Sequence, residues 1–157
     1  MPTGQGAYRI KLSEERCIMY SNIIHLTDLS KAALPALQAA QELAKRLGSH
    51  LHVCYVAHPP LVTSGETLID PKSGETRDIP AELEAAVNRD PAVERELHFL
   101  LVERSAGVKE VLKALPPLDA GLLVVGMHKK TGLAGFLGGS FTEEIVREAG
   151  CPVLVVK

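Results

Sequence analysis

The chain has 157 residues, the length of one ordinary domain, and its charges nearly balance. Hydrophobic residues make up 46% of the chain, which excludes a disordered chain. The chain is also long enough to form a core that needs no disulfide or bound metal for stability. The 17 basic and 19 acidic side chains give a net charge of −2, with no prominent run of Lys or Arg. We therefore expect no nucleic-acid partner, because such binding needs basic residues gathered on one surface.

Cysteine usage and hydropathy predict a cytoplasmic protein. The three cysteines, Cys17, Cys54 and Cys151, are odd in number and form no C-x-x-C motif, which favours reduced thiols. The first residues are small and polar without an apolar signal core, and no apolar stretch reaches the roughly 20 residues of a membrane helix. We expect no membrane partner.

Five short apolar runs predict the strands of one sheet. They cover residues 23–27, 51–57, 97–102, 122–125 and 153–156. Several are apolar at nearly every position, which is typical of parallel strands covered on both faces. Helical patterns separate the runs, so we predict an α/β fold, an open five-stranded parallel sheet with helices on both faces. Residues 1–21 are expected to form an N-terminal extension and 22–157 a single domain.

Periodicity and capping residues predict four helices. The first would follow Ser30 as its N-cap and end at Gly48. The others are expected over 81–87, 108–115 and 140–150. The stretch 59–80 holds two glycines and four prolines without an apolar period, and we interpret it as a long exposed loop.

The segment from Gly126 to Ser140 carries the clearest signal of a binding site. It follows an apolar run and contains glycines at 126, 132, 135, 138 and 139. Gly139 and Ser140 precede a helical pattern in which Ser140 and Glu143 form a capping box, so free N–H groups and the helix dipole favour an anion there. Thr142 adds a hydroxyl donor and Lys129 a positive charge. Phosphate is the expected ligand. The alternative is that this segment is a flexible connector with an ordinary N-cap and binds nothing.

Two further polar residues follow predicted strands or lie in this loop. Asp28 follows the first apolar run, at the end where ligands bind. It either contacts the ligand or supports the following helix through its charge. His128 could contact a phosphate or be solvated. In a parallel sheet, ligands bind outside the carboxyl ends of the strands, which is where both residues are expected.

A metal site is the weaker hypothesis for the histidines. His50, His52 and Cys54 alternate on one side of the second run, and His25 on the neighbouring strand could join them. No spacing matches a known structural metal site, so we expect no metal.

Several of these segments, in the right order, resemble the universal stress protein family. That family has a loop written G-x-x-G-x9-G-[S/T]; this chain has Gly126, Lys129 in place of the second glycine, nine residues from 130 to 138, and Gly139-Ser140. It also ends in a C-P-V-L-V-V phrase, residues 151–156, and opens with the similar phrase 23–30. The resemblance spans about residues 22–157.

The resemblance implies a Rossmann-like nucleotide-binding fold with strand order 3-2-1-4-5 and a homodimer joined through the last strand. The bare apolar edge at 153–156 favours the same dimer independently. The implied ligand is ATP or a related adenine nucleotide, with Mg²⁺ as its companion. Its expected contacts are Asp28 on the adenosine side and, around ribose and phosphates, Gly126, His128, Lys129, Gly139, Ser140 and Thr142.

The predicted function is a non-enzymatic, adenine-nucleotide-binding regulator of stress response. Lys129 supports a rival, a dimeric interaction module of the same fold that binds no ATP, because a side chain replaces the glycine of the family loop. A slow ATP hydrolase is the third alternative, since only Asp28 or His128 could act as a general base.

Overall fold

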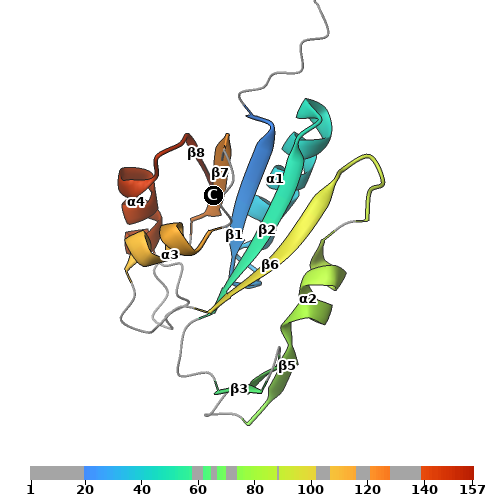
Figure 1. Ribbon diagram of the computed structural model, residues 1–157, viewed down its shortest axis with the longest axis vertical. Coiled ribbons are helices and arrows are strands. Elements are labelled where there is room, and N and C mark those ends of the chain that lie inside the picture. Colours follow the sequence, from blue (N-terminus) through green and yellow to red (C-terminus); the bar gives the residue numbers. More distant parts are fainter. Residues whose placement is uncertain are drawn as a thin grey trace, which may run out of the picture.

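The computed structural model describes residues 20–57, 62–64, 67–69, 74–87, 89–101, 107–115, 121–127 and 139–157. Their core is one five-stranded parallel sheet (Figure 1). Its strands are β1 (Asn22–Thr27), β2 (His50–Ala57), β6 (Arg95–Leu101), β7 (Leu122–Gly126) and β8 (Val153–Val156). They lie in the order β6-β2-β1-β7-β8. Numbered among themselves along the chain, these five strands read 3-2-1-4-5, so the expected topology is confirmed.

Helices cover both faces of this sheet, as predicted (Figure 1). They are α1 (Leu34–Leu47), α2 (Ile79–Ala86), α3 (Val108–Ala114) and α4 (Gly139–Glu148). One buried cluster joins α1 and α2 to the sheet through Leu37 and Leu83, and a second joins α3 and α4 through Val111 and Ile145. The two clusters are separated by the sheet because successive strand residues point to opposite faces.

The expectation of one long loop over 59–80 is wrong. A second, antiparallel sheet occupies part of this segment, with β3 (Val62–Ser64), β4 (Thr67–Ile69) and β5 (Thr76–Asp78). Strands of three residues are too short to show periodicity, which hid them from pattern analysis. In the structure Ser64 of β3 pairs with Thr67 of β4, so two residues separate the strands. The first of these two is a glycine, which is a common sequence signal for a hairpin.

Two predicted helix starts also need correction. Ala33, not Ser30, is the N-cap of α1, because a turn in which Ala33 N–H donates to the Ser30 carbonyl at 3.0 Å delays the helix. Ser140 lies within the first turn of α4, which begins at Gly139, and is therefore not its N-cap. The C-terminal end of α1 is as predicted: Gly48 adopts φ 64°, which a residue without Cβ tolerates best.

Candidate functional site

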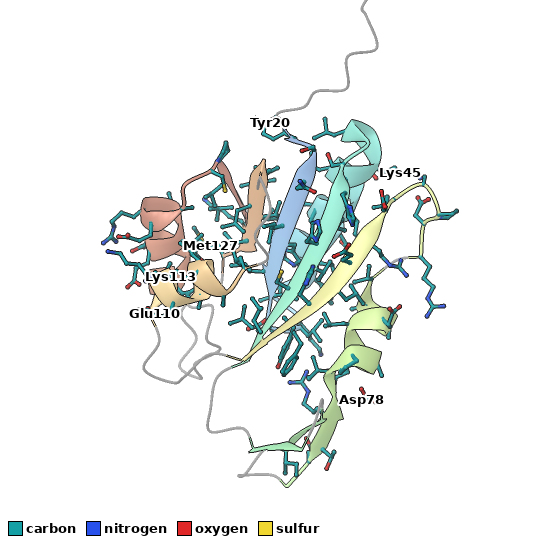
Figure 2. The ribbon with its side chains drawn as sticks, in the orientation of Figure 1. Tyr20, Lys45, Asp78, Glu110, Lys113 and Met127 are labelled. Atoms are coloured by element: carbon teal, nitrogen blue, oxygen red, sulfur yellow. The ribbon has the colours of Figure 1, made fainter. Side chains whose placement is uncertain are left out.

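The predicted site lies where strand order reverses, between β1 and β7. On one side of this pair lie β2 and β6, and on the other lies β8, while α1, which follows β1, and α4, which follows β7, cover opposite faces of the sheet. In open α/β sheets, ligands bind outside the carboxyl ends of the strands at such a point. Parallel pairing matches Ile23 with Leu122 and His25 with Val124. Continuing that register brings Asp28 level with Met127. Met127, which follows β7, is labelled in Figure 2. The ends of both strands therefore meet at one edge, as the sequence indicated.

Asp28 begins a tight turn from β1 into α1. Its Oδ1 atom accepts the N–H of Ser30 at 2.9 Å, and Thr27 Oγ1 accepts the N–H of Leu29 at 3.0 Å. Leu29 has φ 59°, a left-handed conformation that costs an L-residue about 1–2 kcal/mol. These two side-chain bonds hold the strained turn, and with it the Asp28 carboxylate, in a fixed position at the end of the strand.

Gly126 and Thr142 join the end of β7 to the first turn of α4. Gly126 is buried against the start of α1, where an added Cβ would lie 3.5 Å from the Ala32 carbonyl oxygen and from Ala36 Cβ. Thr142 is also buried, and its Oγ1 donates to the Gly126 carbonyl at 3.1 Å. In this structure the Thr142 hydroxyl therefore positions the N-terminus of α4, and it is not presented to solvent as a phosphate donor.

The remaining predicted contacts lie in or beside the glycine-rich loop. The backbone of Gly139 and Ser140 forms the first residues of α4, where amide groups lack partners within the helix. His128 and Lys129 lie outside the described residues. The structure thus brings Asp28, Gly126 and the N-terminus of α4 to the same edge of the sheet.

Two buried polar atoms lie on β1 or in the turn that follows it, and sequence analysis did not assign either residue to the nucleotide site. Within the part of the chain that the structure describes, Ser30 Oγ and His25 Nε2 have no hydrogen-bond partner. His25 Nδ1 lies 3.0 Å from the Val124 carbonyl, which can only accept, so Nδ1 carries the proton of the neutral ring. Burial lowers the pKa of His25 to about 4 despite that bond and the nearby Asp28 charge.

His25 does not lie with His50 and His52, so it cannot join them in one metal site as the sequence suggested. It pairs with Val53 and shares the face of the sheet that α1 covers. His52 and Cys54 alternate with Val53 and therefore point to the opposite face. Burial raises the pKa of the Cys54 thiol to about 12, so this cysteine is a packed, protonated group.

A separate hollow of about 350 Å³ opens at the amino-terminal edge of the sheet. It lies between α1, the end of α2 and the starts of β2 and β6, on the side marked by Lys45 in Figure 2. Lys45 Nζ and Asp90 Oδ2 line it and form an ion pair at 2.8 Å. Because it lies away from the carboxyl ends of the strands, we keep the β1–β7 edge as the candidate site.

A profile of the universal stress protein family matches residues 19–157, and thus most of the chain. The chain belongs to the universal stress protein family. It is 28% identical to universal stress protein MJ0531 of Methanocaldococcus jannaschii over an alignment of 151 positions, which covers 88% of this chain and 83% of that protein. The family resemblance seen in the sequence is therefore confirmed.

Solved structures of this family have the same fold. A universal stress protein from Archaeoglobus fulgidus in complex with dAMP aligns with a TM-score of 0.57 and 24% identity, covering 89% of this chain and all of that one. A universal stress protein in complex with cAMP aligns with a TM-score of 0.58 and 23% identity, covering 87% and 96%. No helix among the described residues is long and apolar enough to cross a membrane.

Proposed function

We propose that this universal stress protein is a non-enzymatic regulator that holds an adenine nucleotide, with ATP as the natural ligand, at the carboxyl ends of β1 and β7. The observation that carries this proposal is the convergence of Asp28 and the N-terminus of α4 on the edge where strand order reverses. The dAMP and cAMP complexes of two proteins with this fold support the adenine class of ligand.

The chemistry of the edge matches the two ends of a nucleotide. The amide groups that open α4 and its dipole suit phosphate, and Thr142 fixes that helix through the Gly126 carbonyl. The Asp28 carboxylate can accept hydrogen bonds from ribose hydroxyl groups, since the Ser30 N–H occupies only Oδ1 in the turn. Lys129 and His128 are the further phosphate contacts that the sequence predicts, and a Mg²⁺ ion bound with the nucleotide would offset part of the phosphate charge.

Gly139→Val should abolish nucleotide binding while the fold survives. A branched side chain at the first residue of α4 would occupy the space that phosphates need beside the amide groups. Titration calorimetry with ATP and Mg²⁺ should show at least a tenfold loss of affinity. Gly150→Val is the matched control. Gly150 follows the opposite end of α4, and a Cβ added there would have no atom within 4 Å. Equal affinity of the two variants would move the phosphate site elsewhere.

The same titration decides between this function and its rival. Lys129, where the family loop has glycine, favours an interaction module that binds no nucleotide. Failure of the natural sequence to bind at millimolar ATP, together with an empty extract from freshly purified protein, would leave the interaction module as the function. We assign no catalytic step, and the buried His25, whose Nδ1–H donates to Val124, is not available as a general base.

We also propose that the protein is a homodimer joined through β8, the last strand of the sheet. Val155→Lys should weaken dimerisation by at least about tenfold, because a charge on an edge strand opposes strand pairing. Sedimentation or light scattering over a concentration series would measure this. Ala85→Lys, an exposed change on α2, should leave the dimer unchanged. A monomeric natural protein at micromolar concentration would contradict the proposal.

A further inference from the structure

Three imidazoles and a carboxylate gather on β2 and β6, away from the nucleotide edge. His50 and His52 come from the start of β2, and Glu96 and His98 from β6. The parallel register pairs His52 with Glu96 and Cys54 with His98, so all four side chains share one face of the sheet. From His52 to the end of β2 the strand runs on for about 16 Å, which separates this cluster from the candidate nucleotide site.

Three ligand-type atoms of this cluster form a compact triangle. His52 Nδ1 and His98 Nε2 share a hydrogen bond of 3.0 Å, which a bound ion would replace, and they lie 3.7 and 3.6 Å from Glu96 Oε2. A point equidistant from the corners of such a triangle is about 2.0 Å from each of them. Zn–N and Zn–O bonds measure about 2.0–2.2 Å, so the gap between these atoms has the size of a zinc ion with its bonds.

His50 supplies a fourth candidate ligand. Its ring stacks on that of His52 with 4.4 Å between centroids. Its Nε2 atom is buried, has no hydrogen-bond partner among the described residues, and lies 3.7 Å from Glu96 Oε1. That distance is too long for a hydrogen bond but suits two ligands of one ion. Ligand atoms of His50, His52 and Glu96 all lie within 4.8 Å of one another.

An imidazole binds a metal through the lone pair of its neutral ring, so both ring nitrogens of each histidine are possible ligand atoms. The cluster stands on two hydrogen-bonded strands, a scaffold that holds ligands in place better than a loop does.

We propose that His52, His98 and Glu96, with His50 as the fourth ligand, form a binding site for a divalent transition metal, with Zn²⁺ as its occupant. Three imidazoles and one carboxylate are ligands that zinc accepts in tetrahedral geometry, and magnesium or calcium would require oxygen ligands instead. The ion ties the edge strand β6 to β2. This site replaces the expectation, drawn from ligand spacing alone, that the chain has no metal, and it is independent of the nucleotide proposal.

The test is metal titration of the full chain after removal of bound metal with a chelator. Zn²⁺ should bind at one equivalent per chain, and Co²⁺ should give the visible absorption of a four-coordinate ion without a thiolate charge-transfer band. Glu96→Gln and His98→Gln should each weaken zinc binding at least tenfold. Both side chains are partly exposed, at 57% and 22%, so these variants should fold even if a His52 variant does not.

Glu144→Gln is the matched control for this titration. Glu144 is an exposed carboxylate on α4, whose main contacts are with α3 and β8. The zinc affinity of this variant should stay within twofold of that of the natural protein. Equal affinities for all variants, or a thiolate band that indicates cysteine ligands, would overturn the proposed site, as would the absence of stoichiometric binding.

Discussion

Acidification from pH 7 to pH 4 should remove about 3 kcal/mol of folding stability through His25 alone. The unfolded imidazole takes up a proton as the pH falls below its ordinary pKa of 6.5, whereas burial delays protonation of the folded ring until about 4. Between these values the unfolded state binds more protons, so the free energy of unfolding falls by about 1.4 kcal/mol for each pH unit. The contribution is fully present above pH 6.5 and is lost as the pH approaches 4.

His25→Met provides the comparison for this prediction. Methionine fills a similar space without a titratable group, although it loses the bond to the Val124 carbonyl and so begins from lower stability. Urea unfolding of both proteins at several pH values, with a chelator present, separates His25 from the other titrating groups because the two proteins share them. If the natural protein and His25→Met lost stability in parallel between pH 6.5 and 4, the predicted role of His25 would be wrong.

Leu37→Ala should destabilise the protein by about 2–5 kcal/mol, a large part of the total stability of an ordinary domain. Leu37 is 1% exposed and belongs to the cluster that joins α1 to the sheet. The substitution loses buried apolar surface and leaves a cavity, and helix propensity does not offset this because alanine and leucine both favour helix. Since α1 also packs on Gly126, the loosened helix should weaken the nucleotide edge as well.

The matched control for this core substitution lies on the same helix. Leu34 is 39% exposed, so Leu34→Ala removes the same atoms from a partly solvated position. We expect it to cost less than about 1 kcal/mol in urea unfolding. Similar losses for the two variants would mean that α1 does not pack on the sheet as described.

Local sequence was sufficient for the five strands of the parallel sheet, the fold class and the edge at which the site is predicted, but not for the short strands β3, β4 and β5. Each buried strand is a run of apolar residues flanked by polar or glycine positions, and alternation with helices requires parallel crossovers. Gly48 was predictable because a helix end that needs positive φ selects glycine wherever it occurs. The placement of Asp28 and Gly126 at one edge followed from the same logic, since parallel strands all end on the same side.

What the sequence could not supply was the partner of each side chain. The face that His25 occupies, the triangle of His52, His98 and Glu96, and the bond from Thr142 to Gly126 all depend on register between segments far apart in the chain. A shift of one residue in that register would turn every side chain of a strand to the other face, and a strand that is apolar on both faces has no alternating pattern to fix its register. The start of α1 was likewise decided by a turn held by Asp28 and Thr27, which overrode the local preference for Ser30 as a cap.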